Sequence, residues 1–188
     1  MAYRAIDATP VIARLAARLG RGPGMLIRAE RRGAVALRAG GRSAMPGQVS
    51  TGEIHHLRLT VTDLERSRQF YTQLLGFEVA VESPPPEDPS AAEAFKILFG
   101  GVVMTRGNLI MGLRPTAAPG DRFSPDRVGL DHLSFSVASH DDLEQAVRLF
   151  DERGVTHGQI TRLPSFGIDV LPFEDPDGVQ LELSAPAA

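Results

Sequence analysis

The chain has 188 residues, of which 43% are hydrophobic and 23% are charged, and its formal net charge is −3. This length suits one domain with a hydrophobic core, and the composition is that of an ordinary globular protein. The sequence has no cysteine, which excludes disulfides, thiolate metal sites and cysteine nucleophiles. It also has no run of the roughly 18 apolar residues that a membrane span needs. We therefore expect neither a membrane nor a nucleic acid as a partner.

The charge is distributed unevenly along the chain. Residues 1–50 hold nine arginines against Asp7 and Glu30, a balance of +7, whereas residues 51–188 hold 11 basic and 21 acidic side chains, a balance of −10. This break predicts a domain boundary near residues 45–50. The stretch VIARLAARL at residues 11–19 suits either a basic amphipathic helix that touches a membrane or targets the chain, or an extension with little structure. We expect the second, a poorly ordered extension over residues 1–50, and, since no secretory signal is recognisable, a cytoplasmic protein.

The part after this boundary, residues 51–188, contains an internal repeat. The segment HLRLTVTDLERSRQFYTQLLGF begins at His56, and the similar HLSFSVASHDDLEQAVRLFDERGV begins at His132. Each predicts a strand of about six residues, a capped helix with an apolar stripe, and a glycine, Gly76 or Gly154, that ends the helix. The predicted caps pair a hydroxyl with an acidic residue three positions later; they are Thr62 with Glu65 and Ser139 with Asp142.

Three further strands are expected after each helix. They are Phe77–Glu82, Lys96–Met104 and Asn108–Arg114 in the first copy, and His157–Arg162, Ile168–Phe173 and Val179–Ser184 in the second. Residues 83–90, SPPPEDPS, predict a proline-rich loop. Neither copy can bury two faces by itself, so we expect an α+β fold in which module one (residues 52–116) and module two (residues 128–185) pair into a larger curved sheet.

The first and last strands of this repeat have one polar and one apolar face. Because side chains alternate along a strand, the apolar residues are expected under the helices and the polar residues on the opposite side. The polar sets are His56, Arg58 and Thr60 in the first strand, His132, Ser134 and Ser136 in its copy, and Gln180, Glu182 and Ser184 in the last strand. Three strands thus direct His56, His132 and Glu182 toward one concavity.

Two imidazoles and one carboxylate form the facial set that holds Fe(II), Mn(II), Zn(II) or a similar ion and leaves positions for water or substrate. The alternative is that each side chain is a surface or core residue with local hydrogen bonds. The matched repeat positions of the histidines, and the glutamate on the matching face, favour the metal site. The sequence therefore predicts His56, His132 and Glu182 as ligands of one divalent metal ion.

These segments, together with GLDHLSFSV and the closing FEDPDGVQLELS, resemble the vicinal oxygen chelate superfamily, which includes glyoxalases, extradiol dioxygenases, and bleomycin- and fosfomycin-resistance proteins. The resemblance extends over about residues 52–185. It implies two paired βαβββ modules that form a cupped mixed β-sheet with helices on the outside. It also implies that His56, His132 and Glu182 occupy the family's metal-ligand positions.

The same resemblance indicates where this chain departs from known members. Glyoxalase-like members have a fourth ligand, Glu or Gln, on the last strand of the first module. This chain has Gly112 there, or Met111 if the alignment gap is placed differently. Similar extradiol dioxygenases have a tyrosine three residues before the closing Asp-Pro, where this chain has Pro172. Fosfomycin-type enzymes bind substrate with a basic residue that has no obvious counterpart after Glu182. These departures weigh against a four-ligand lactoylglutathione lyase and against catechol cleavage of that type.

Candidate substrate-binding and catalytic residues are expected beside the ligands. Arg58 and Arg114 either face the cup and bind an anionic substrate oxygen, or form surface ion pairs. The candidate bases that move a proton are Glu182, displaced from the metal, and His157, for which the alternative is a loop residue without a role in the site. The histidines expected outside the site are His55, which points away from its neighbour, and His140, which is solvated near a helix N-terminus.

The leading hypothesis is a divalent-metal-dependent enzyme, a lyase, isomerase or dioxygenase, that acts on a small substrate chelating the metal through vicinal oxygens. The alternative hypothesis is a bleomycin-resistance-like protein that binds or sequesters a small molecule without turnover. We also expect a homodimer, because uncovered sheet edges favour association. The sequence is compatible both with modules that pair within one chain and with modules that pair between two chains.

Overall fold

The computed structural model describes Gly47, Val49 and residues 51–187. The chain divides into two compact units, residues 1–53 and 54–188, and the fold described below is that of the second unit. Residues 11–19, for which a basic amphipathic helix was one of two alternatives, lie outside the described residues. Among the helices that the structure does describe, none is long and apolar enough to cross a membrane.

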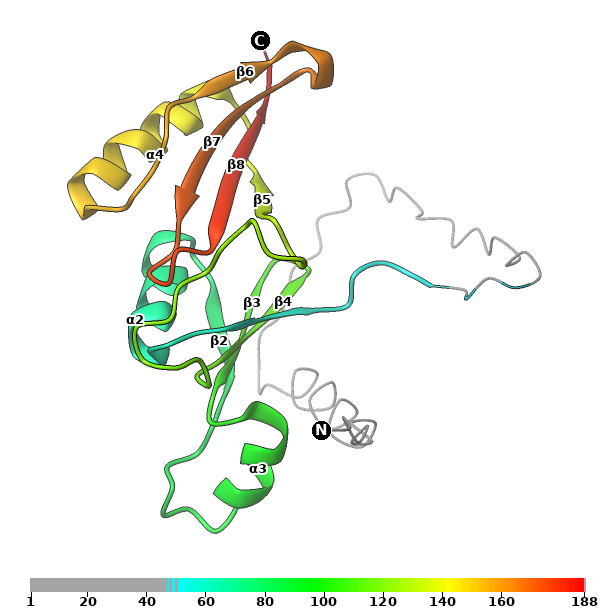
Figure 1. Ribbon diagram of the computed structural model, residues 1–188, viewed down its shortest axis with the longest axis vertical. Helices are drawn as coiled ribbons and strands as arrows, with labels where there is room; N and C mark the ends of the chain where they lie inside the picture. Colours follow the sequence, from blue (N-terminus) through cyan, green and yellow to red (C-terminus); the bar gives the residue numbers. More distant parts are fainter. Residues whose placement is uncertain (1–46, 48, 50, 188) are drawn as a thin grey trace, which may run out of the picture. The chain divides into compact units, whose positions relative to one another are not determined.

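The second unit consists of two modules, each with a strand, a helix and then three more strands (Figure 1). The first comprises β1 (Leu57–Thr60), α2 (Leu64–Gln69), the π-helix η1 (Phe70–Leu74), β2 (Glu78–Glu82), α3 (Ala91–Leu98), β3 (Val102–Arg106) and β4 (Leu109–Arg114). The second comprises β5 (Leu133–Ser136), α4 (His140–Arg153), β6 (Thr161–Leu163), the 3-10 helix η2 (Pro164–Phe166), β7 (Ile168–Glu174) and β8 (Gln180–Pro186).

Each module forms one four-stranded mixed sheet. The strand orders are β1-β4-β3-β2 and β5-β8-β7-β6, so the two sheets have the same topology. In each sheet the first strand of the module runs parallel to the last, β1 to β4 and β5 to β8, and the other pairs are antiparallel. This arrangement confirms the predicted α+β fold and the repeat of strand, helix and three strands.

The ends of the helices follow the sequence signals with one exception. Ser139 accepts from the backbone of Asp142, whose carboxylate accepts from the Ser139 N–H, and this capping box confirms the predicted start of α4. Gly154 ends α4 in the left-handed conformation, as predicted. The cap of α2 is Asp63 rather than Thr62, because the Thr62 hydroxyl donates instead to Asp177.

The prediction of a strand over residues 96–104 is half wrong. Residues 91–98 form α3, and the strand β3 begins only at Val102. The segment AAEAFKIL is rich in helix formers, and its apolar residues continue into the apolar strand that follows, which hides the boundary. Phe99 then ends the helix in the left-handed conformation, and Gly100 and Gly101 separate it from β3.

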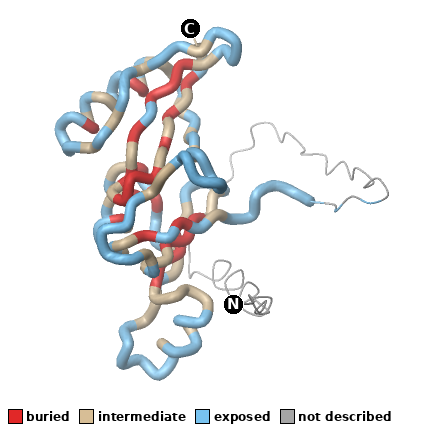
Figure 2. The backbone as a smooth tube through the Cα atoms, in the orientation of Figure 1, coloured by how far each residue is buried: buried red, intermediate tan, exposed pale blue. Residues whose placement is uncertain are grey.

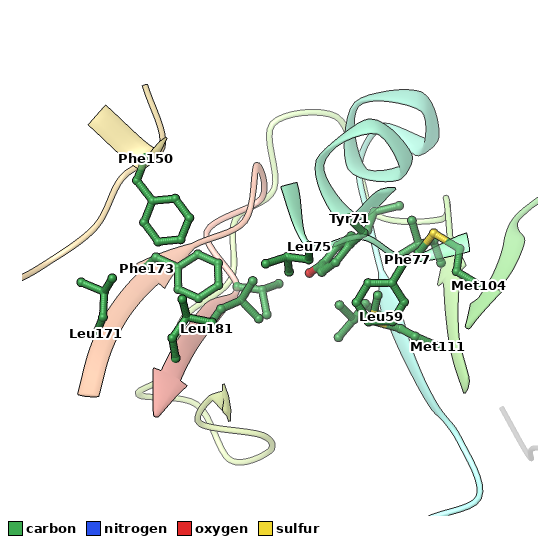
Figure 3. Packing of buried hydrophobic residues seen from close by; sticks show 14 of the residues in the cluster. Leu59, Tyr71, Leu75, Phe77, Met104, Met111, Phe150, Leu171, Phe173 and Leu181 are labelled. Atoms are coloured by element: carbon green, nitrogen blue, oxygen red, sulfur yellow. The ribbon is translucent and has the colours of Figure 1, made fainter. Parts of the chain in front are cut away.

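One hydrophobic core joins the two modules. In the second module, Phe150 of α4 stacks on Phe173 of β7 with ring centroids 4.8 Å apart (Figure 3). The ring of Phe70, from the first module, has its centroid 6.4 Å from that of Phe173. In the first module, the buried Tyr71 contacts Phe77 edge to face. Burial of this shared cluster stabilises both sheets, at roughly 25 cal/mol for each Å² of apolar surface removed from water.

The turn before β8 also ties the modules together. Asp175 accepts a 2.9 Å hydrogen bond from the Tyr71 hydroxyl, and Asp177 accepts one of 2.9 Å from the backbone N–H of Thr62. Arg66 of α2 adds an ion pair to Asp177. Burial raises the pKa of Asp175, although hydrogen bonds from the backbone of Val179 and from Tyr71 oppose the shift. The Asp-Pro-Asp-Gly segment therefore connects α2 to the strand that contains Glu182.

Candidate metal and substrate site

The polar and apolar faces of the key strands are those that the alternation predicts. In β1, Leu59 is buried, whereas Arg58 and Thr60 are exposed. In β8, the leucines and alanine at alternate positions are buried, whereas Glu182 and its polar neighbours are half-buried. Figure 2 shows this burial along the strands and the exposed connection between β4 and β5. The exposed residues His56 and His132 directly precede β1 and β5.

The second module brings two of the proposed ligands onto one face. Glu182 lies opposite Ser134 in the parallel pair, and His132 lies two residues before Ser134, so the imidazole and the carboxylate are diagonal neighbours. The Oε1 atom of Glu182 accepts from the hydroxyls of Ser134 at 2.8 Å and Ser184 at 2.9 Å. The Nδ1 atom of His132 lies 2.5 Å from a carboxylate oxygen of Asp131.

The hydrogen bonds of His132 and Glu182 suit a metal ligand set. A carboxylate on one imidazole nitrogen fixes the ring and directs the other nitrogen, here Nε2, toward an ion. The two serine hydroxyls fix the Glu182 carboxylate in the same way through one of its oxygens. The role of Asp131 was not predicted, although an acidic residue directly before the histidine was a visible signal in the sequence.

The first module places His56 at the corresponding position of its own sheet. Its Nδ1 atom is 2.9 Å from Nδ1 of His55, and the two rings meet edge to face, so the prediction that His55 points away is wrong. Partial burial, followed by the nearby His55 and Arg58, lowers the pKa of His56. This shift favours the neutral imidazole, which is the form that binds metal ions.

The three proposed ligands do not come together within one chain. Among residues 51–187, no group of three or more histidine, aspartate or glutamate side chains is placed to hold a metal ion. His132 and Glu182 are on the second sheet, and His56 is on the first. One chain therefore presents a two-ligand half and a one-ligand half, each with donor atoms that suit a divalent ion.

A family model described as Glyoxalase/Bleomycin resistance protein/Dioxygenase superfamily matches residues 53–183. The chain belongs to this superfamily. It is 33% identical over 131 residues to the protein YwkD of Bacillus subtilis (strain 168), a match that spans 69% of this chain and 94% of YwkD. It is 26% identical over 133 residues to MhqA of the same organism, which is named as a ring-cleaving dioxygenase, and this match spans 70% of the chain and 40% of MhqA.

Solved structures of the glyoxalase/bleomycin resistance/dioxygenase superfamily have the same fold. The crystal structure of such a domain from Frankia sp. EAN1pec matches with a TM-score of 0.57 and 26% identity, over 73% of this chain and 93% of that one. The resemblance to the vicinal oxygen chelate proteins that the sequence indicates is thereby confirmed.

The strand register identifies Gly112 as the first-module counterpart of Glu182. Gly112 lies opposite Arg58 in the pair of β1 and β4, as Glu182 lies opposite Ser134 in the pair of β5 and β8. Glycine therefore occupies the position at which the resemblance implies a fourth ligand in glyoxalase-like members. Met111, the counterpart under a different placement of the alignment gap, is not at that register position.

The arginines predicted to bind substrate both lie beside Phe99. The guanidinium carbon of Arg114 is 4.2 Å from the centre of the Phe99 ring, and that of Arg58 is 5.7 Å away. Arg58 also donates from Nη1 to the Ile97 carbonyl at 3.1 Å. Phe99 was not predicted as a site residue because its segment was expected to be a strand; the two glycines that follow it were the available signal.

The candidate base His157 lies beside α4 rather than beside Glu182. Its ring contacts Phe150, its Nδ1 is 2.8 Å from the Gly158 carbonyl oxygen, and its Nε2 is 3.2 Å from a carboxylate oxygen of Asp151. The hydrogen bond with the Gly158 carbonyl raises the pKa of His157; burial opposes this shift, and Asp151 adds to it. Both ring nitrogens are thus engaged with the protein.

His140 is not the solvated residue that the sequence indicates. Its Nδ1 is 2.8 Å from a carboxylate oxygen of Asp169, which is only 1% exposed, and Arg162 donates to the same carboxylate at 2.8 and 2.9 Å. Asp169 shares the helix-facing side of β7 with Leu171 and Phe173, away from Glu182. This cluster links the start of α4 to the β6–β7 hairpin and has no part in the candidate metal site.

A groove of about 860 Å³ lies on the helix side of β5, between α4 and the first module. Its apolar floor includes Leu109, Phe135 and Leu149, and its rim is charged. None of the proposed metal ligands or substrate-binding arginines lines it. The candidate site is therefore the polar face of the sheets and not this groove.

Proposed function

We propose that this protein is a divalent-metal-dependent enzyme of the glyoxalase/dioxygenase superfamily that acts on a small substrate with two vicinal oxygens. The observation that supports this most strongly is the repeat of the fold itself. His56 and His132 occupy the same position in two sheets of identical topology, and Glu182 shares the face of His132. Superfamily membership, with a ring-cleaving dioxygenase among the relatives, agrees with an enzymatic role.

In this proposal His56, His132 and Glu182 hold one divalent ion. Such an ion supplies Lewis-acid stabilisation of the negative charge that develops on substrate oxygen. Asp131 orients the His132 ring, and Ser134 and Ser184 hold the Glu182 carboxylate. Their hydrogen bonds fix the geometry of the two ligands before substrate arrives, which lowers the cost of ordering the site.

Glu182 is the better supported of the two candidate bases. It is on the polar face, where a substrate that reaches the metal ligands would lie, and it would take the proton once displaced from the ion. His157 contacts α4 and both of its nitrogens have protein partners, so it would need to break these contacts to take a proton. Arg58 and Arg114, on the face of His56, are the proposed substrate-binding cations.

We further propose that a homodimer completes the ligand set. The two-ligand half of one chain would meet the His56 half of a second chain, because the described residues of one chain do not assemble the three donors. A symmetric dimer would form two such sites, one from each pair of modules. The cytoplasmic location expected from the sequence stays a prediction.

The experiment is elemental analysis of metal content per chain. Wild-type protein should hold about one ion for each chain, and the variants His56→Ala, His132→Ala and Glu182→Ala should each lose metal affinity by more than the ~10–100-fold typical of losing an outer partner. His140→Ala is the matched control and should keep its metal, because its partner Asp169 is on the opposite side of the sheet. Circular dichroism would verify that each variant is folded.

The outcome also separates enzyme from binding protein. Metal-dependent turnover of a substrate with vicinal oxygens supports the enzyme. Tight binding of bleomycin without turnover, by protein with full metal content or none, would contradict it and favour the sequestering protein. Unchanged metal content in all three ligand variants would show that the matched positions do not form a metal site.

A further inference from the structure

The two modules differ in charge at three equivalent positions. The strand registers pair Arg58 with Gly112 and Thr60 with Arg114 in the first module, and Ser134 with Glu182 and Ser136 with Ser184 in the second. The equivalent triplets are therefore Arg58, Gly112 and Arg114 in the first module and Ser134, Glu182 and Ser184 in the second. One carboxylate held by two hydroxyls in the second module is replaced by two guanidiniums around a glycine in the first.

Gly112 leaves the space that Arg58 occupies. A Cβ atom at residue 112 would lie 3.0 Å from Nε and 3.4 Å from Cγ of Arg58. The arginine side chain therefore passes over the position from which Glu182 extends in the second module. Because any larger residue at position 112 would displace it, the glycine and the arginine form one structural unit.

Phe99 holds the two guanidiniums near each other. Its ring centre lies 4.2 Å from the guanidinium carbon of Arg114 and 5.7 Å from that of Arg58. Phe99 has a φ of 54°, and it is the non-glycine residue with positive φ among the described residues. Such a conformation is unfavourable for a residue with a side chain and persists only where its surroundings fix it.

The surroundings of Phe99 are fixed by the backbone. The Phe99 N–H donates to the Phe95 carbonyl at 2.8 Å. The Gly101 N–H donates to the Leu98 carbonyl, also at 2.8 Å. A Cβ atom at Gly101 would lie 1.9 Å from the Leu113 carbonyl oxygen, so the chain passes close against β4. The end of α3 thus places an aromatic ring between two cations on the face that also presents His56.

The Arg114 guanidinium has unused hydrogen-bonding capacity. Its Nε atom is buried and has no hydrogen-bond partner within the part of the chain that the structure describes. Arginine recognises carboxylate and phosphate through paired N–H groups, and stacking on an aromatic ring leaves the edge of the guanidinium available for this. A partly buried cation of this kind is expected to have an anionic partner.

We propose that Arg58, Arg114 and Phe99 form an oxyanion receptor, and that the substrate has a carboxylate or phosphate group in addition to its two vicinal oxygens. The statement about substrate rests on the proposed function, whereas the receptor itself does not depend on the metal. The acidic half of the site, with Glu182, would hold the ion, and the basic half, with Arg58 and Arg114, would hold the anionic end of the substrate.

The test is anion binding to the full chain after its metal has been removed by a chelator. Inorganic phosphate and acetate are titrated separately, and the Nε–H signals of the arginines are followed by NMR. We expect saturable shifts for Arg58 and Arg114 with at least one anion. Binding by both, by phosphate alone, or by acetate alone supports the receptor and assigns the group that it recognises.

Two variants and one control make the result specific. Arg114→Gln removes one cation, and Gly112→Glu introduces beside Arg58 the carboxylate that the second module has. Each should weaken anion binding by at least ~10-fold, the lower end of what charged hydrogen bonds contribute. Arg106→Gln removes an exposed cation from β3 of the same sheet and should leave the affinity unchanged.

The proposal is overturned if neither anion gives saturable shifts, or if Arg106→Gln weakens binding as much as the two variants do. Should Arg114→Gln fail to fold by circular dichroism, Gly112→Glu is the second test, because the new side chain would meet the flexible side chain of Arg58 rather than a backbone atom. Unchanged metal content in the three ligand variants, together with saturable anion binding, would contradict the metal site and leave this receptor intact, so the two failures are distinguishable.

Discussion

At the scale of single residues, the environment decides what each polar side chain does. His132 and His140 each directly follow a residue that forms side-chain hydrogen bonds. His132 nevertheless lies on the polar face with Glu182, whereas His140 is paired with the buried Asp169. Sequence alone did not distinguish them fully, because the partner of His140 is 29 residues away and reaches it only through the fold.

Asp169 should make stability depend on acidic pH. The hydrogen bonds from Arg162, with a further contribution from His140, lower the pKa of Asp169 to about 2, although desolvation opposes them. A carboxylate with a lowered pKa in the folded state stabilises the fold above its ordinary pKa, and this contribution is lost as the pH falls. We expect Asp169→Asn to be less stable than wild type at neutral pH, with a difference that narrows from about pH 4 to about pH 2.

Urea unfolding of both proteins across this range measures the difference. Asp126→Asn, which changes an exposed carboxylate in the connection between the modules, is the control and should follow wild type at every pH. A gap between wild type and Asp169→Asn that stays constant down to about pH 2 would show that Asp169 does not titrate in this window.

At the scale of secondary structure elements, the turn that precedes β8 has two tasks. It starts the strand that contains Glu182, and it binds α2 and the end of β1 through Asp177 and Asp175. The sequence DPDG predicts the turn from local chemistry. It does not predict the second task, because Thr62 is 115 residues away from Asp177 and was expected to cap its own helix.

Asp177→Ala should therefore destabilise the junction of the modules. It leaves the Thr62 N–H without its acceptor, and losing a buried hydrogen-bond partner costs about 1–3 kcal/mol. The Arg66 ion pair adds less, because the Arg66 side chain is 49% exposed. We expect the free energy of unfolding in urea to fall by about 2 kcal/mol.

Asp126→Ala serves as the matched control, since it removes an exposed carboxylate and should change stability by less than about 0.5 kcal/mol. If Asp177→Ala is as stable as Asp126→Ala, the contacts of the turn do not hold the modules together.

The elements that follow local rules were predicted, and those set by distant contacts were not. Strand alternation gave the faces of β1, β5 and β8, and the Ser139 capping box gave the start of α4. The boundary between α3 and β3 was missed because the apolar run continues through both. For the same reason the position of Phe99 between Arg58 and Arg114 was not visible in the sequence.

At the scale of the whole molecule, the candidate site is divided between two sheets. Sequence symmetry predicts matched faces, but it does not determine whether the faces meet within one chain or between two. Among the described residues the three proposed ligands stay apart within one chain. A dimer that pairs the His56 half of each chain with the Glu182 half of its partner would satisfy both the repeat and this separation.

The most direct measurement is the metal content of a mixture of His56→Ala and His132→Ala chains, unfolded together and refolded. Each variant alone should hold no metal. In a mixed dimer one site would lose both histidines and the other would keep all three ligands. A site shared between chains therefore predicts about one ion for each mixed dimer, isolated by two different affinity tags. A mixed dimer as empty of metal as the two parent variants, beside a metal-loaded wild type, would contradict a site shared between chains.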